Sequence, residues 1–191
     1  MGETRYCLCC GENVPFNYVE RHERREITCA YCGFTLDVQK LWEPSKISEG
    51  HVLVADDSKY VRDIIVDALK AGRVCANVVA VENGLELTSV FSKLISENSS
   101  IDAAIIDLNM PIMDGITAAR TMRAIETQHR IQPTPVIFFS AVKADEALRA
   151  QMDMLAPASY VNKGSDPDPD SLARRVEQLV GYLVEKYRKA G

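Results

Sequence analysis

The sequence predicts a doubly wound α/β fold with a five-stranded parallel sheet, preceded by a small cysteine-rich module. Two observations carry this prediction. Beyond residue 51, short apolar runs alternate with amphipathic stretches, an arrangement typical of parallel strands joined by helices. Residues 1–43 instead hold five of the six cysteines and show little strand or helix periodicity. We therefore expect a cysteine module at 1–43, a polar linker at 44–50 and a larger domain at 51–191.

Five short apolar runs in the larger domain have the length and composition of buried β-strands. They lie at residues 51–55, 75–81, 101–107, 135–140 and 158–162. Helical spacing of apolar residues fills the gaps, at 61–69 with Gly72 placed to end the helix, at 87–94, at 115 to about 128, and at 144–155. A last helix is predicted from Asp170, a residue suited to an N-cap, to the end of the chain. Right-handed crossovers then place helices on both faces of the sheet.

The bulk composition indicates a globular protein and excludes several classes. The chain of 191 residues is 47% apolar, which is ample for a packed core. Its net charge of -5 provides no general basic field for nucleic acid. No run reaches the roughly 18 apolar residues of a membrane span, and the N-terminus has no apolar signal core. A cytoplasmic location is therefore expected.

Acidic residues, a hydroxyl and a lysine follow the predicted strands at the points where those strands end. Asp56 and Asp57 follow the first strand, Asp107 the third, Ser140 the fourth and Lys163 the fifth. Parallel strands bring their carboxyl ends to one edge of a sheet, so these side chains should meet there. Clustered carboxylates repel one another, and Mg²⁺, which prefers oxygen ligands, would relieve that repulsion.

This group of residues suits phosphoryl transfer, in which a protein mainly positions groups and neutralises charge. Asp107 would attack, Mg²⁺ and Lys163 would offset the charge of the transferred group, and Ser140 would donate a hydrogen bond to it. The alternative is that each aspartate only caps a helix or lies solvated in a loop, as an isolated aspartate after a strand usually does. The coincidence of five such residues at four strand ends favours the first interpretation.

Residues 51–191 resemble the receiver domain of two-component response regulators. The resemblance rests on the pair Asp56 and Asp57, the loop DLNMPIMDG at 107–115 and Lys163, and it covers about three quarters of the chain. It implies a flavodoxin-like sheet of strand order 2-1-3-4-5. It also implies that Asp107 accepts the phosphoryl group from a histidine kinase or phosphotransfer protein, and that Asp56, Asp57, Asp107 and the backbone carbonyl of Asn109 surround Mg²⁺.

The same resemblance implies a conformational switch. Phosphorylation would draw Ser140 towards the phosphoryl group and let Tyr160, on the fifth strand, turn inward. This would change the face formed by the helix at 144–155, the strand at 158–162 and the last helix, where a downstream protein or a second copy of the chain would bind. The protein would not be an enzyme beyond its own phosphotransfer and dephosphorylation. Gly164 follows Lys163 where receivers usually carry proline, so the turn that positions the lysine differs.

The cysteine module carries two C-x-x-C-G motifs, Cys7 with Cys10 and Cys29 with Cys32, separated by 18 residues. Two such turns can present four thiolates tetrahedrally, the geometry preferred by structural zinc. The module resembles zinc ribbons and rubredoxin-like knuckles over roughly residues 5–40, and iron in the same site is the alternative. So small a module would need the metal in order to fold.

Three other residues that could bind metal fall outside the paired motifs and are interpreted as bystanders. Cys9 adjoins Cys10 and would make a strained ligand pair with it, while Cys75 opens an apolar strand. His22 lies in a charged stretch that is typical of a solvated surface. We therefore expect Cys7, Cys10, Cys29 and Cys32 alone to bind the metal.

The predicted function is that of a two-component response regulator that signals by protein–protein interaction, with the zinc module fixing the partner or the location. After the predicted last helix no room remains for a separate output domain. Two alternatives stay open. The zinc module could bind nucleic acid and regulate transcription under control of the receiver, although the alternation of its arginines with glutamates disfavours nucleic acid. The receiver fold could also serve as an unphosphorylated scaffold.

Overall fold

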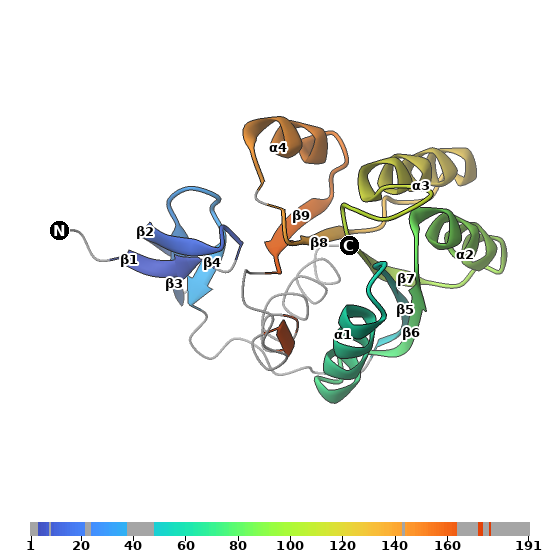
Figure 1. Ribbon diagram of the computed structural model, residues 1–191, viewed down its shortest axis with the longest axis horizontal. Coiled ribbons are helices and arrows are strands. Elements are labelled where there is room, and N and C mark those ends of the chain that lie inside the picture. Colours follow the sequence, from blue (N-terminus) through green and yellow to red (C-terminus); the bar gives the residue numbers. More distant parts are fainter. Residues whose placement is uncertain are drawn as a thin grey trace.

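The described residues form two β-sheets, one in each predicted module (Figure 1). The computed structural model describes residues 4–7, 9–21, 24–37, 48–142, 144–163, 172–173 and 176. The smaller sheet lies at one end of the molecule, and helices surround the larger sheet (Figure 1). Among the helices of these residues, none is both long and apolar enough to cross a membrane.

The larger sheet consists of five parallel strands in the order β6-β5-β7-β8-β9. Its strands are β5 (Ser48–Ala55), β6 (Cys75–Val81), β7 (Ile101–Ile106), β8 (Val136–Ser140) and β9 (Ala158–Asn162). The expected strand order 2-1-3-4-5 is therefore confirmed, and only β5 differs from its predicted bounds by more than one residue. Every residue of β8 is buried, as a strand covered on both faces should be.

In the described part of the chain, the helices that join these strands are α1 (Lys59–Ala71), α2 (Gly84–Ser96), α3 (Gly115–His129) and α4 (Glu146–Asp153). Each begins at a side chain that accepts a hydrogen bond from an N–H of the first turn, namely Ser58, Asn83, Asp114 and Asp145. Gly72 ends α1 as predicted, and α4 is shorter than predicted because its cap is Asp145. The last predicted helix lies outside the described residues except at 172–173 and 176.

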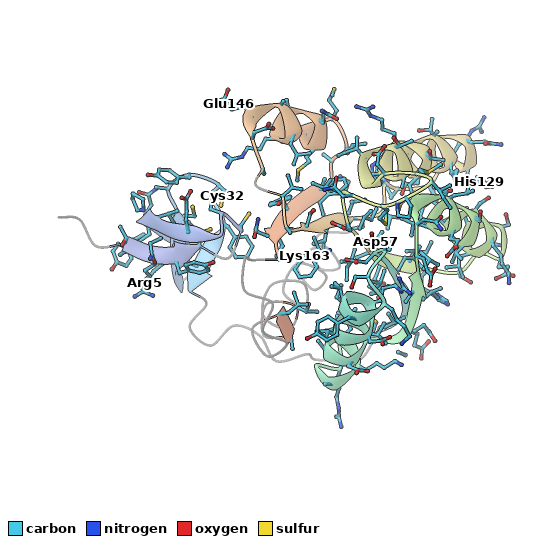
Figure 2. All side chains as sticks on the ribbon, viewed as in Figure 1. Arg5, Cys32, Asp57, His129, Glu146 and Lys163 are labelled. Carbon is cyan, nitrogen blue, oxygen red and sulfur yellow. The ribbon has the colours of Figure 1, made fainter. Side chains whose placement is uncertain are left out.

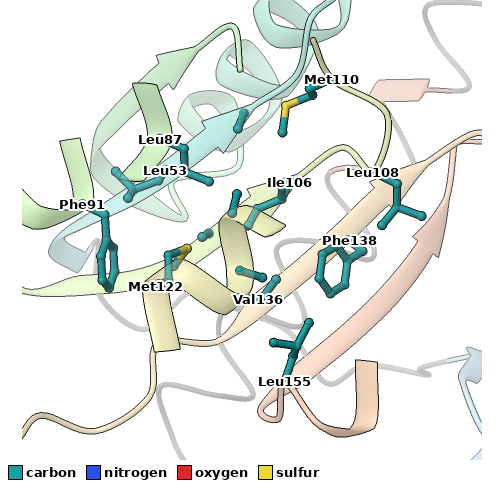
Figure 3. Packing of buried hydrophobic residues seen from close by; sticks show 14 of the residues in the cluster. Leu53, Leu87, Phe91, Ile106, Leu108, Met110, Met122, Val136, Phe138 and Leu155 are labelled. Atoms are coloured by element: carbon teal, nitrogen blue, oxygen red, sulfur yellow. The ribbon is translucent and has the colours of Figure 1, made fainter. Parts of the chain in front are cut away.

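The helices bury both faces of the larger sheet, with α1 on one side and α2 and α3 on the other (Figure 1). Alternate residues of β5 enter the two cores: Val52 and Val54 pack with residues of α1, and Leu53 and Ala55 pack with residues of α2 and α3. Figure 3 shows the second core, where Phe91 of α2 lies over the sheet. Because both faces are covered, only the ends of the strands are left to present polar chemistry.

The cysteine module is a four-stranded antiparallel sheet in the order β1-β2-β3-β4. Its strands are β1 (Thr4–Cys7), β2 (Glu12–Arg21), β3 (Arg24–Cys29) and β4 (Thr35–Asp37). The sequence periodicity did not indicate these strands, because few apolar side chains are buried in the described part of the module, where Cys7, Val14 and Cys29 form one cluster and Ile27 is also buried. Cysteines occupy the places that large aliphatic residues take in an ordinary sheet.

The variant Phe91→Ala should lower the free energy of unfolding by about 3–5 kcal/mol. Phe91 is fully buried, so its truncation removes apolar contacts and leaves a cavity. Leu85→Ala on the same helix is the matched control, because Leu85 is 49% exposed and its loss should cost less than about 0.5 kcal/mol. Urea unfolding of both variants measures the difference. Equal losses would contradict the packing of α2 described here.

Candidate functional site

Three carboxylates meet at the carboxyl edge of the larger sheet. Asp56 directly follows β5 and Asp107 directly follows β7, two strands that pair in register up to Ala55 and Ile106. One oxygen each from Asp56, Asp57 and Asp107 lies within 4.8 Å of the others. Asp56 and Asp107 are buried while Asp57 is exposed, so the cluster is open to solvent on one side.

Lys163 bridges two of these carboxylates from the far edge of the sheet (Figure 2 labels Lys163 and Asp57). Its Nζ lies 2.6 Å from Oδ2 of Asp56 and 3.3 Å from Oδ2 of Asp107. Burial raises the pKa of Asp56 and the Lys163 ammonium opposes that shift. The lysine therefore neutralises part of a charge that the sheet edge would otherwise hold unfavourably.

Ser140 and Tyr160 lie on the neighbouring strands β8 and β9 next to this lysine. The backbone N–H of Lys163 donates to the carbonyl oxygen of Ser140 over 2.9 Å, and the Tyr160 hydroxyl donates to the same oxygen over 3.3 Å. Burial raises the pKa of Tyr160 to about 12, so its hydroxyl stays protonated and can donate. Asn109 is exposed two residues beyond Asp107. Asp56, Asp57, Asp107, Ser140 and Lys163 therefore follow or end strands at one edge, while Tyr160 lies within β9.

Arg62, on α1, supports the acidic turn and was not identified from the sequence. Its guanidinium is buried and donates to the carbonyl oxygens of Asp56 over 2.7 Å and Asp57 over 3.2 Å. It also pairs with Glu82 at 2.8 Å. Its position in the helix could have identified it, because Arg62 lies three residues before Ile65 on the buried face of α1. A charged residue on a buried face needs partners.

Local hydrogen bonds fix the orientation of the carboxylates. The Ser58 N–H donates to Oδ1 of Asp56 over 3.0 Å, and the Leu108 N–H donates to Oδ1 of Asp107 over 2.8 Å. Each of these contacts holds one oxygen of a carboxylate. A Cβ at Gly115 would clash with the carbonyl oxygen of Asp107, so the chain can turn into α3 beside the cluster only with glycine there.

The donor set fits a hard divalent cation such as Mg²⁺. Three of the candidate ligands are carboxylates whose oxygens are close enough to share one ion, the fourth is the backbone carbonyl of Asn109, and the exposure of Asp57 leaves room for water in the coordination shell. Without an ion, only Lys163 offsets the charges of Asp56 and Asp107 at short range among the described residues. The cluster thus has the ligand chemistry that the sequence predicted.

The four paired cysteines converge in the small module. The sulfurs of Cys7, Cys10, Cys29 and Cys32 lie within 4.8 Å of one another. The Sγ–Sγ distance is 3.6 Å between Cys7 and Cys32 and 3.8 Å between Cys10 and Cys29. A tetrahedral ion with metal–sulfur bonds of about 2.3 Å requires sulfurs about 3.8 Å apart, so the cluster fits a tetrahedral thiolate-bound metal.

Backbone amides point at the cysteine sulfurs in both turns. The N–H of Cys10 donates to Sγ of Cys7, and the N–H of Cys32 donates to Sγ of Cys29, each over 3.4 Å. Gly11 and Gly33 have φ of +74° and +70°, which lets each turn close without a side-chain clash. Such amides stabilise thiolate charge, as a metal ligand requires.

The close sulfurs shift the pKa values of their neighbours in opposite directions. A hydrogen bond with Cys32 and burial raise the pKa of Cys7. The same hydrogen bond with Cys7 lowers the pKa of Cys32. Close sulfurs therefore compete for protons, and a bound cation would let all four ligands ionise together.

The other candidate ligands lie as follows. Cys9 is not among the four clustered sulfurs, which agrees with the expectation that it is not a ligand, and its thiol donates to the carbonyl oxygen of Tyr160 over 2.8 Å. Cys75 is buried in β6 of the larger sheet. His22 lies outside the described residues.

The chain is thus an α/β protein with a doubly wound sheet, and an acidic cluster and a lysine lie at the carboxyl edge of that sheet. A family model described as the response regulator receiver domain matches residues 52–177. Because that match covers more than half of the chain, the protein belongs to the response regulator receiver family.

Curated relatives include bacterial methylesterases and a yeast kinase. The chain is 35% identical over 151 residues to protein-glutamate methylesterase/protein-glutamine glutaminase 4 of Hahella chejuensis, covering 73% of this chain and 34% of that protein. It is 23% identical over 183 residues to the peroxide stress-activated histidine kinase mak3 of Schizosaccharomyces pombe, covering 92% of this chain and 7% of that kinase. The chain thus spans about a third or less of the length of these relatives.

Solved structures share the fold. The receiver domain of the histidine kinase CKI1 from Arabidopsis thaliana, complexed with Mg²⁺ and BeF₃⁻, matches with a TM-score of 0.60 at 17% identity, over 75% of this chain and 92% of that one. The response regulator domain of Thermotoga maritima CheB matches with a TM-score of 0.51 at 23% identity, over 74% of this chain and 95% of that one. At these identities the likeness concerns the fold.

Magnesium binding should weaken on acidification at a higher pH than it does for an ordinary aspartate site. Burial raises the pKa of Asp56 above 3.8, and Asp56 binds a cation only when it is deprotonated, so affinity should fall about tenfold per pH unit below that raised pKa. Calorimetric Mg²⁺ titrations at a series of pH values measure the profile. Asp63→Asn, at an exposed position of α1, is the control and should leave the profile unchanged. If the Mg²⁺ affinity began to fall only at or below pH 3.8, the assignment of Asp56 as a ligand would be contradicted.

Proposed function

We propose that this protein is a two-component response regulator in which Asp107 accepts a phosphoryl group from a histidine kinase or phosphotransfer protein. The observation that carries the proposal is the position of Lys163, whose ammonium lies 3.3 Å from Asp107 and 2.6 Å from Asp56. A cation placed between a nucleophile and a metal-binding carboxylate suits the neutralisation of a transferred phosphoryl group. Membership of the receiver family supports the same role.

In the proposed reaction, a carboxylate oxygen of Asp107 forms a bond to phosphorus while the bond from phosphorus to the donor imidazole nitrogen breaks, its electron pair staying on nitrogen. The Leu108 N–H holds Oδ1 of Asp107, which leaves Oδ2 as the nucleophile beside Lys163. Lys163 then pairs with one phosphoryl oxygen and the Ser140 hydroxyl donates to another. Mg²⁺, held by Asp56, Asp57, Asp107 and the carbonyl of Asn109, supplies the remaining charge neutralisation.

The proposed output is a change in protein–protein interaction. Ser140 and Tyr160 share a hydrogen bond at the edge of the sheet, so a shift of Ser140 towards a phosphoryl group would alter the surroundings of Tyr160. The face of α4, β9 and the helix predicted from residue 170 would then bind a downstream protein or a second copy of the chain. The proposed location is cytoplasmic, and the methylesterase activity of the bacterial relatives is not proposed for this chain, because the chain spans about a third or less of their length.

The proposed role of the cysteine cluster is structural zinc binding by Cys7, Cys10, Cys29 and Cys32. The Sγ–Sγ distances of 3.6 Å and 3.8 Å support a tetrahedral ion. The small size of the module supports a need for such an ion, since its described buried apolar residues are Cys7, Val14, Ile27 and Cys29 with a few partly buried neighbours. The proposed division is a zinc module at 1–43, a linker at 44–50 and a receiver at 51–191, with the difference that residues 48–50 of this linker belong to β5 of the larger sheet.

Incubation with acetyl phosphate and Mg²⁺ should give a single phosphoryl adduct by intact mass, because Asp107 is the one proposed acceptor among the three clustered carboxylates. Asp107→Asn should abolish the adduct, since an amide oxygen is a far weaker nucleophile than a carboxylate. Asp63→Asn on α1, where Asp63 is 59% exposed, should retain it. An adduct that survives Asp107→Asn, or that forms equally without Mg²⁺, would overturn the proposal.

Replacement of Cys29 by serine should release zinc and unfold the small module, because three thiolates bind the ion far more weakly than four. Cys75→Ser is the matched control, since Cys75 is buried in the other sheet and lies outside the four-sulfur cluster. Zinc content by elemental analysis and limited proteolysis of residues 1–48 measure the two effects. Full zinc content in Cys29→Ser would exclude the four-cysteine site.

A further inference from the structure

The first cysteine turn lies against β9 of the receiver (Figure 1). The Cys9 thiol donates to the carbonyl oxygen of Tyr160 over 2.8 Å. Two residues on, Gly11 approaches the side chain of Asn162 so closely that an added Cβ would lie 3.3 Å from Oδ1 of Asn162. Both contacts fall at the end of the strand that precedes Lys163.

The second cysteine turn makes no such approach in the described part of the chain. Tyr31 takes the place in that turn that Cys9 takes in the first, and it is 59% exposed. An added Cβ at Gly33, the counterpart of Gly11, would meet nothing within 4 Å. The two turns share geometry, with φ of +74° at Gly11 and +70° at Gly33, but Tyr31 and Gly33 do not make the contacts with β9 that Cys9 and Gly11 make.

A further contact involves the apolar core on the α1 side of the sheet. Phe34, which follows the second cysteine turn, packs against that core, whose members include Phe139 and Val161. Cys9 packs on the opposite side, with the core that includes Tyr160. Successive residues of β9 point to opposite faces, so the small module touches this edge strand on both sides.

The strand that the small module touches also reaches the phosphorylation site. The Tyr160 hydroxyl donates to the Ser140 carbonyl oxygen over 3.3 Å, and the Lys163 N–H donates to the same oxygen over 2.9 Å. The Lys163 ammonium then lies 3.3 Å from Asp107. A short series of hydrogen bonds and covalent links therefore runs from Cys9 to Asp107 through β9.

We propose that the cysteine module is an intramolecular partner of the receiver, docked on β9 through Cys9 and Gly11, and that metal binding by the cysteines and phosphorylation of Asp107 stabilise each other. The inference rests on the proposed function. A phosphoryl group held by Ser140 and Lys163 restrains the end of β9, which lowers the entropy lost when the first turn docks there. Thermodynamic coupling between two sites is reciprocal, so metal binding to the cysteine module must also stabilise the phosphorylated form of the receiver.

The test uses the full-length chain and its equilibrium affinity for zinc, measured by competition with an excess of the colorimetric chelator 4-(2-pyridylazo)resorcinol. The affinity is measured in Mg²⁺ alone and in Mg²⁺ with beryllofluoride, an analogue of the phosphoryl group. We expect beryllofluoride to raise the zinc affinity by about five-fold or more, the lower end of ordinary coupling between sites. An unchanged or lower affinity overturns the inference.

Matched glycine variants show whether the coupling passes through the contact with β9. Asparagine is among the side chains best tolerated at positive φ, so Gly11→Asn and Gly33→Asn impose similar backbone strain on the two turns. Only the side chain at position 11 meets Asn162. Gly11→Asn should bring the beryllofluoride effect to within two-fold of none, and Gly33→Asn should keep the wild-type effect. If both variants lose the beryllofluoride effect, or if both keep it, coupling through the contact with β9 is overturned.

Two further measurements separate failure of this inference from failure of the proposed function. Zinc content near one per chain and a Mg²⁺-dependent phosphoryl adduct on Asp107 are measured on the same samples. If either is absent, the proposed function fails and this inference fails with it. If both are present and the zinc affinity is the same with and without beryllofluoride, the proposed function stands and only the coupling is overturned.

Discussion

The concentration of negative charge at one edge of the larger sheet is the constraint on which the rest of the structure depends. The pairing of β5 with β7 brings Asp56 and Asp107 together, and burial raises the pKa of Asp56. Lys163 opposes this cost from β9, while Arg62 holds the backbone of the acidic turn. Most of the packed sheet can be understood as the support that keeps these charges near one another and away from bulk water.

The cysteine module solves a different problem, that of folding with almost no apolar core. Its described buried residues are few, and two of them are cysteines of the cluster. Positive φ at Gly11 and Gly33 closes two similar turns around the sulfurs. A metal that binds four thiolates can supply the free energy that such a small core lacks, so the ligands and the core of this module are largely the same side chains.

The edge strand β9 connects these two parts of the protein. It lies at the end of the sheet order and would otherwise expose backbone groups, and the thiol of Cys9 covers one of them, the Tyr160 carbonyl. The same residue donates its hydroxyl to Ser140 beside the acidic cluster. Tyr160 therefore contacts the small module through its backbone and, through its side chain, the strand end beside the acidic cluster. This double contact makes β9 suited to carry a signal between the two modules.

The sequence by itself determined the five-stranded parallel fold, the strand ends that carry Asp56, Asp57, Asp107, Ser140 and Lys163, and the two cysteine pairs. These could be predicted because apolar periodicity and ligand spacing are local, and because parallel strands bring their carboxyl ends to one edge. The small antiparallel sheet, the buried partners of Arg62 and the contact of Cys9 with Tyr160 were decided only by the tertiary structure. In the small sheet cysteines replace the apolar residues that produce a pattern. The Cys9 contact joins residues 151 positions apart, and no local pattern specifies such a meeting.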